Sequence, residues 1–129
     1  MKYSELTDAL LDFWTARAEG VPAAELEIRE VQRFDPRTPD TICVRKLGDW
    51  GVMRIDYSTN PSLWGPLIKK HTIAVSKGSN QISFPGWYAK LGLRNLWDET
   101  GGAFGEEPEI AICRAVVRSV FGDEVEDLA

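Results

Sequence analysis

The sequence predicts a single α+β domain in which an antiparallel β-sheet packs against an N-terminal and a C-terminal helix. Three observations lead to this fold class. Both ends of the chain repeat apolar residues at helical spacing, and the middle alternates apolar and polar residues as strands do. A chain of 129 residues can bury one hydrophobic core without disulfide bonds or a structural metal. We therefore expect residues 1–129 to form one domain.

The N-terminal helix has clear start and stop signals. Thr7 belongs to the residue types that cap helix N-termini, and Asp8 places negative charge in the first turn. Apolar residues then recur at helical spacing at Leu10, Phe13, Trp14 and Ala18. Gly20 favours the left-handed conformation that ends a helix, and Pro22 blocks its continuation. One face of this helix is expected to be core.

The middle of the chain alternates in the manner of strands. Apolar residues two apart share a face at Leu26 and Ile28, Ile42 and Val44, Met53 and Ile55, and Ile73 and Val75. Gly48–Gly51 lies between two of these runs and predicts a hairpin with Trp50 at its exposed tip. Further strands are candidates at 81–84 and 87–89. The two prolines at 35–41 predict a flexible loop.

The C-terminal helix is predicted from Pro108, a good first residue, to about Phe121 before Gly122. Apolar side chains of 110–121 cover roughly two-thirds of its circumference, whereas a surface helix usually hides about a third. Something must therefore cover it: the segment 98–107, which we expect to be a mobile loop, or the same helix of a second chain in a homodimer. The candidate interface residues for that dimer are Ile110, Cys113, Val117 and Phe121.

Charge is segregated along the chain. Residues 57–97 hold five cations and no acid, net +5; these are Lys69, Lys70, Lys77, Lys90 and Arg94. Residues 98–129 hold nine acids and two arginines, net −7. A basic segment rich in aromatic residues is typical of single-stranded nucleic-acid binding, although it also fits basic strands beside acidic helix ends. The acidic tail 123–129 is expected to be solvated, with mimicry of a phosphate backbone as the alternative.

Several kinds of site are excluded by what the sequence lacks. No two glycines are separated by a single residue, which removes the dinucleotide-binding fingerprint, and no phosphate-binding loop or nucleophile elbow occurs. With one histidine and two distant cysteines, no zinc-binding spacing is present. We expect no metal and no cofactor. The longest uncharged stretch has 12 residues, below the ~20 that span a membrane, and the acidic N-terminal residues do not fit a signal peptide. A cytoplasmic protein is expected.

His71, Cys43 and Cys113 are the remaining candidates for chemistry. His71 follows two lysines at an expected strand start and is either a general base, an anion contact or an ordinary strand-end residue. The cysteines lie in apolar runs, where a thiol usually acts as an inert small hydrophobe. No nucleophile is identified.

The segment 57–70 combines aromatic residues, prolines and cations, and we expect a stiff turn in which Pro66 opens a short helical turn. Trp64 is either a lid over the core or an exposed anchor for a partner. The candidate binding residues are Tyr57, Trp64, Pro66, Lys69, Lys70 and His71.

Three segments of the sequence resemble the NinX-like family of small proteins of tailed phages and prophages. They are Ser4–Thr7 opening a helix that ends at Ala18–Gly20, the block from Tyr57–Ser58 to Gly65–Ile68, and the closing Phe121–Val125. The resemblance implies a phage or prophage origin and an αβα sandwich. It implies no known activity, cofactor or catalytic residue.

These observations favour a non-enzymatic phage accessory protein that binds another protein, with a homodimer as one form of that association. The alternative is a nucleic-acid-binding accessory protein that uses the basic aromatic segment 57–97. An enzyme is the least favoured class, because it requires a pocket that holds His71 beside a polar partner.

Overall fold

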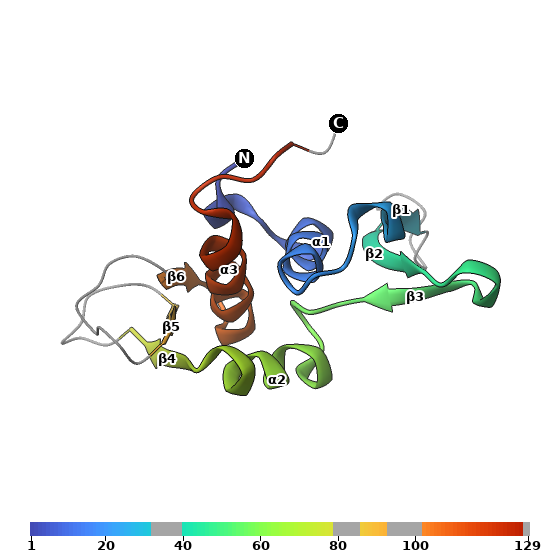
Figure 1. Ribbon diagram of the computed structural model, residues 1–129. Helices are drawn as coiled ribbons and strands as arrows, with labels where there is room; N and C mark the ends of the chain where they lie inside the picture. Colours follow the sequence, from blue (N-terminus) through green and yellow to red (C-terminus); the bar gives the residue numbers. More distant parts are fainter. Residues whose placement is uncertain (32–39, 79–85, 93–101, 128–129) are drawn as a thin grey trace.

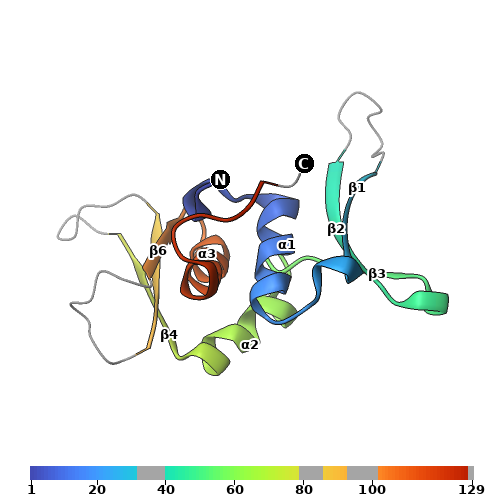
Figure 2. The same ribbon diagram turned by 45° about the horizontal axis from the view of Figure 1, so that its top comes forward.

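The computed structural model describes residues 1–31, 40–78, 86–92 and 102–127, and places the helices between two small sheets (Figures 1 and 2). The helices are α1 (Asp8–Ala18), α2 (Pro61–His71) and α3 (Pro108–Phe121). The strands are β1 (Leu26–Val31), β2 (Asp40–Lys46), β3 (Val52–Ile55), β4 (Ile73–Lys77), β5 (Trp87–Leu91) and β6 (Gly102–Gly105). The α+β class is confirmed.

The layer order differs from the expected arrangement. The strands form two antiparallel sheets, in the orders β1-β2-β3 and β4-β5-β6, rather than one sheet between two helices. The first sheet lies beside α1 and the second beside α3, with α2 running beneath both helices (Figures 1 and 2). Because α2 separates β3 from β4 in the chain, it carries the backbone from one side of the helical layer to the other.

Helix α1 has the predicted bounds and packs on the first sheet. It begins after Thr7 and is followed by Gly20, whose φ is +96°. Leu11 and Phe13 of α1 are buried in one apolar cluster with Cys43 of β2 and Ile55 of β3, which pair directly in the sheet. This cluster is the first of two apolar clusters in the described part of the chain.

Helix α3 also has the predicted bounds, and its broad apolar surface is covered by the chain itself. Cys113 and Val117 belong to the first cluster, whereas Ile112 and Val116 belong to a second cluster with β4, β5 and β6. The ring of Phe121 meets that of Trp14 edge to face at 5.2 Å. Both sides of α3 are therefore buried within one chain.

Two expected loops differ from the structure in part. Gly102–Gly105, inside the predicted loop 98–107, is strand β6, and the small residues of β6 let it lie against α3. Asp40 and Thr41, at the end of the predicted loop 35–41, begin β2. The rest of loop 35–41, residues 98–101 and the candidate strand 81–84 lie outside the described residues.

The acidic tail is tied to the N-terminal segment through its backbone over its described part, and its acidic side chains, Asp123, Glu124, Glu126 and Asp127, are exposed. The N–H of Tyr3 donates to the carbonyl of Asp123 at 3.1 Å, and the N–H of Val125 donates to the carbonyl of Met1 at 2.8 Å. Val125 is buried. Among the described residues, no helix combines the length and the apolar character that crossing a membrane requires.

Candidate functional site

The segment expected to be a stiff turn is largely helix α2. Asn60 caps this helix through its side-chain oxygen, which accepts a hydrogen bond from the N–H of Ser62 at 3.0 Å, and Pro61 occupies the first helical position. Pro66 lies inside α2 rather than at its start, which corrects the expectation. Its missing N–H removes one hydrogen bond from the helix.

Tyr57 and Trp64 pack on the core. Both are partly buried, and each lies against both apolar clusters, so they fill the junction between the two halves of the molecule. Burial raises the pKa of the Tyr57 hydroxyl above its usual value. For Trp64, this packing supports the lid interpretation over the exposed anchor.

The cations of the segment 57–97 are not grouped as one free patch in the described structure. Lys70 pairs with Glu19, Lys77 lies over the ring of Trp87 at 5.9 Å, and Lys90 is buried. Lys69 is exposed on α2, and Arg94 lies outside the described residues.

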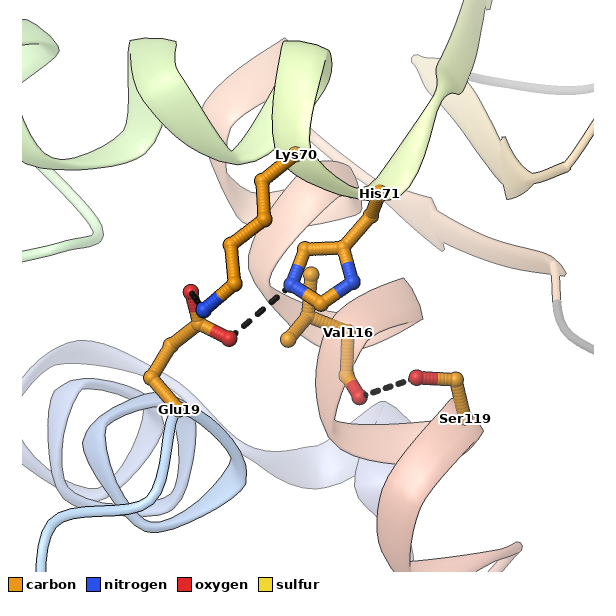
Figure 3. Close-up of polar contacts among 5 residues, drawn as sticks. All are labelled: Glu19, Lys70, His71, Val116 and Ser119. Carbon is orange, nitrogen blue, oxygen red and sulfur yellow. Dashed lines mark hydrogen bonds and ion pairs between the residues drawn. The ribbon is translucent and has the colours of Figure 1, made fainter.

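His71 is the last residue of α2 rather than the start of a strand, and it joins a charged cluster shown in Figure 3. Its Nε2 lies 2.9 Å from Oε2 of Glu19, at the end of α1, and Nζ of Lys70 lies 3.1 Å from Oε1 of the same carboxylate. The Glu19 side chain is only 9% exposed. A carboxylate held in this way fixes the orientation of an imidazole and joins the ends of the two helices.

The nearby hydroxyl of Ser119 is engaged by its own helix. Its Oγ donates to the carbonyl of Val116 at 2.7 Å, as drawn in Figure 3. The Glu19 carboxylate already occupies the position that an external anion would take on Lys70 and His71. The cluster therefore has the features of a structural tie.

A groove lies between α1 and the first sheet. Its volume is about 510 Å³, and it is lined by Thr7, Asp8, Ala9, Leu10, Phe13, Leu26, Glu27, Ile28 and Thr41. A smaller pocket of about 90 Å³ shares Asp8, Ala9 and Thr41 with the groove and adds Asp12, Asp40, Arg54, Ser58 and Thr59. The two cavities therefore adjoin, one mainly apolar and one polar.

Asp12 is the most perturbed carboxyl group at this place. It is buried, and its Oδ1 accepts a hydrogen bond of 2.7 Å from the N–H of Ser58. Burial raises the pKa of Asp12 to about 6, against the lowering effect of that hydrogen bond. Its titration therefore lies close to neutral pH.

The candidate dimer interface on α3 is mostly inaccessible. Cys113 and Val117 have no exposed surface, and Ile110 and Phe121 are partly buried against the first cluster. Burial also raises the pKa of the Cys43 and Cys113 thiols to about 12, which keeps them protonated and supports their interpretation as small hydrophobes. Within the described ranges, no three metal-ligating side chains form a group that could hold an ion.

Sequence reasoning did not single out Glu19 or Asp12. Glu19 is an ordinary acid at a helix end, and its partners are 51 and 52 residues away in the chain. The sequence did contain a signal for Asp12, because it is the one acid within the run Leu11–Ala16, which is buried in the structure. Carboxylates are rarely buried without a partner, so an acid in such a run indicates a specific contact.

Comparison with known proteins identifies the family. The family model described as Bacteriophage P22, NinX matches residues 2–119. A search of curated proteins found no match. Since the matched region covers most of the 129 residues, the chain belongs to the phage NinX family.

Proposed function

We propose that this phage protein is a non-enzymatic accessory protein that binds another protein through the tip of its β2–β3 hairpin. The observation that carries the proposal is the side chain of Trp50, which is 91% exposed at that tip. The hairpin projects away from the helices (Figures 1 and 2). Its neighbours Leu47, Val52 and Met53 are exposed as well.

The tip is held in a defined conformation. The N–H of Leu47 donates to the carbonyl of Gly51 at 2.8 Å, and a 3-10 turn spans Gly48–Trp50. Gly51 has a φ of +91°, in the region that favours glycine. A Trp side chain carried on such a turn loses little conformational freedom on binding, because the backbone that carries it is already ordered.

The composition of the tip suits a protein partner. Trp is enriched among the residues that dominate binding energies, and exposed apolar patches on soluble proteins mark interaction sites. In contrast, Tyr57 and Trp64 are packed on the core and are not available to stack on bases, and Lys70 is already paired with Glu19. The protein-binding function therefore has more support than the nucleic-acid alternative.

The non-enzymatic part of the proposal rests on the polar groups described above. The imidazole of His71 is bonded to Glu19, the Ser119 hydroxyl is bonded to Val116, and both thiols have raised pKa values. The candidate nucleophiles among these groups are the hydroxyl and the two thiols, and among the described contacts none of them donates to the His71 imidazole, the base that could activate it.

Site-specific photo-crosslinking in phage-infected cells tests this function. A benzophenone amino acid replaces Trp50 in one variant and Val120, which is 51% exposed on α3, in a matched control. We expect a discrete crosslinked product from position 50 that is absent from position 120. The product is then identified by mass spectrometry, and its affinity is measured with purified components.

The substitution Trp50→Ser should weaken that affinity at least tenfold while leaving the melting temperature unchanged, because the ring is exposed. A product of twice the 14.5 kDa chain mass identifies a second copy as the partner. Absence of a product specific to position 50, or an affinity that Trp50→Ser does not change, contradicts the proposal. Binding of single-stranded DNA that falls with salt would favour the alternative function.

A further inference from the structure

Strand β3 is an outer strand of the first sheet and has one free edge. The order in that sheet is β1-β2-β3, so β2 lies on one side of β3 and no described strand lies on the other. Val52 and Met53 are 44% and 45% exposed, and Arg54 is exposed as well. Because β3 follows the Trp50 turn directly, a partner that contacts the tip can also reach this edge.

The hydrogen bonds between β2 and β3 show which backbone groups point to the free edge. The N–H of Leu47 donates to the carbonyl of Gly51, and hydrogen-bonded pairs recur every two residues along an antiparallel ladder. Met53, two residues after Gly51, therefore bonds to β2. The N–H and C=O groups of Val52 and Arg54 point away from β2, and they have no other backbone partner among the described residues.

The edge of β6 in the second sheet is closed, in contrast to the edge of β3. Nη1 of Arg114 donates to the carbonyl of Phe104 at 3.0 Å, and Nη1 of Arg118 donates to the carbonyl of Gly102 at 2.7 Å. Two side chains of α3 thus occupy acceptors on β6. Proteins commonly cover strand edges in such ways because open edges pair with other chains. The open groups on β3 are therefore suited to accept an added strand.

Cations lie on the face of β3 that points away from α1. Val52 and Lys46 are directly opposed in the register and point to the same side of the sheet, as does Arg54, two residues from Val52. Ile55 points to the other side and is buried in the cluster with α1. Lys46 and Arg54 are exposed and form no ion pair among the described residues, whereas Arg29 on the same face is already paired.

The charge of Arg54 is not neutralised by a described carboxylate. Arg54 borders the small polar pocket, and the acids that also line this pocket form no ion pair with it; they are Asp8, Asp12 and Asp40. Asp49, the acid nearest to Lys46 along the hairpin, stands in the turn at the tip. Charge complementarity therefore favours an occupant that brings carboxylates to this face of β3.

We propose that an extended segment of the partner protein, in which acidic and aliphatic residues alternate, adds antiparallel to the free edge of β3. Its acidic residues stand opposite Val52 and Arg54, exchange backbone hydrogen bonds with them and place carboxylates beside Arg54 and Lys46. Its aliphatic residues point to the other face, beside Met53. The inference rests on the proposed function and names the chemistry of the partner. A nucleic acid could neutralise the same cations but could not complete the sheet, which favours a protein segment.

Synthetic peptides of eight residues test the charge pattern on the full chain. One peptide alternates valine with glutamate, a second alternates valine with lysine, and a third alternates serine with glutamate. Fluorescence anisotropy measures the affinities, and amide chemical shifts in NMR spectra locate the contact. We expect the valine–glutamate peptide to bind at least tenfold more tightly than the other two, with its shift changes concentrated on β3. Equal affinities of the three peptides would overturn the inference.

Methylation of the peptide backbone tests strand addition. In the proposed arrangement the N–H groups of the glutamates point to β3, and those of the valines point to solvent. Methylation of the glutamate nitrogens should therefore abolish binding of the valine–glutamate peptide, whereas methylation of its valine nitrogens should change the affinity less than threefold. Full binding by the peptide methylated on glutamate would contradict strand addition.

Charge reversal locates the contact with the acidic residues. Arg54→Glu should weaken the valine–glutamate peptide at least fivefold and tighten the valine–lysine peptide at least threefold, a gain that loss of folding would not produce. Lys69→Glu makes the same charge change at an exposed position on α2 and should change either affinity less than twofold. Equal effects of the two variants would overturn the inference.

These tests separate the inference from the function on which it rests. A partner protein crosslinked from position 50, without binding of the valine–glutamate peptide, would keep the protein-binding function and overturn strand addition. Peptide binding at β3 without a crosslink from position 50 would support strand addition and contradict the role of Trp50. A single-stranded oligonucleotide that shifts the β3 amides when the peptide does not would overturn both, because the cations would then bind phosphates.

Discussion

The carboxylate of Asp12 accepts a hydrogen bond from the backbone N–H of Ser58, 46 residues further along the chain, across 2.7 Å. Both residues are buried. The bond fixes the turn that follows β3 against the middle of α1, which is also where the polar pocket lies. The same carboxyl group is costly to ionise, because burial raises its pKa to about 6.

Stability should therefore depend on pH through Asp12. The pKa in the folded protein, about 6, lies above the ordinary value of 3.8, so the folded state binds more protons between these values. The free energy of unfolding should then fall as pH rises from about 4 to 6, by ~3 kcal/mol at most. In Asp12→Asn, whose carbonyl still accepts from Ser58, this decline should vanish. Urea unfolding between pH 4 and 7.5 measures both curves. A parallel decline in the two proteins would contradict the prediction.

The tie between α1 and α2 should depend on the Glu19 carboxylate. Glu19→Gln removes the charge that faces both Lys70 and His71, and we expect a loss of about 1–2 kcal/mol in unfolding free energy at low salt. Glu30→Gln, at an exposed position on β1, is the control and should change stability by less than about 0.5 kcal/mol. Chemical denaturation of the two variants compares them directly. Equal effects would exclude a specific role for the cluster.

The close approach of β6 to α3 should make Gly105 intolerant of a side chain. A Cβ at this position would lie 2.5 Å from the backbone nitrogen of Ala111, which cannot move without shifting α3. Gly105→Ala should therefore cost about 2 kcal/mol or more. At Gly65, inside α2, a Cβ meets nothing within 4 Å beyond its chain neighbours, and Gly65→Ala should stay within about 1 kcal/mol. Thermal unfolding measures the stability of both variants. A larger loss of stability in Gly65→Ala than in Gly105→Ala would refute the packing argument.

Substitution of two valines of α3 should show whether this helix is buried within one chain or in an interface between two chains. Val117 is fully buried and Val120 is 51% exposed. Val117→Ala should lower the unfolding free energy by about 1–3 kcal/mol, and Val120→Ala should have little effect. The loss should not depend on protein concentration, because one chain covers Val117. The melting temperature of each protein is measured at several protein concentrations. A steeper rise with concentration for Val117→Ala than for the unchanged chain would instead indicate that Val117 lies in an interface between two chains.

The sequence was most informative where local signals agree with packing. Helices α1 and α3 have paired start and stop residues, and the hairpin at Trp50 has glycines on both sides. Helix α2 was missed because Gly65 and Pro66 are read as a turn, whereas the cap at Asn60 and contacts with the core keep this segment helical. Strand β6 was missed because two of its four residues are glycines, which are rare in strands. The structure shows why glycine is needed at Gly105: a side chain there would collide with the backbone of α3.

The candidate site was harder to predict than the fold. Its groups come from segments distant in the chain: Glu19 meets His71, and Asp12 meets Ser58. Pairings of this kind depend on which face of α1 meets which sheet, and local patterns do not contain that information. The division of the strands into two sheets could not be read from periodicity for the same reason, since alternation defines a strand's faces and not its neighbours.

The position of α3 has a consequence for how the protein is made. Helix α3 follows strands β1 to β6 in the chain, yet it contributes side chains to both of the apolar clusters described above. While the ribosome is still adding residues before Pro108, neither half of the nascent polypeptide has its central helix. Both halves therefore complete their folding together, once α3 has left the exit tunnel.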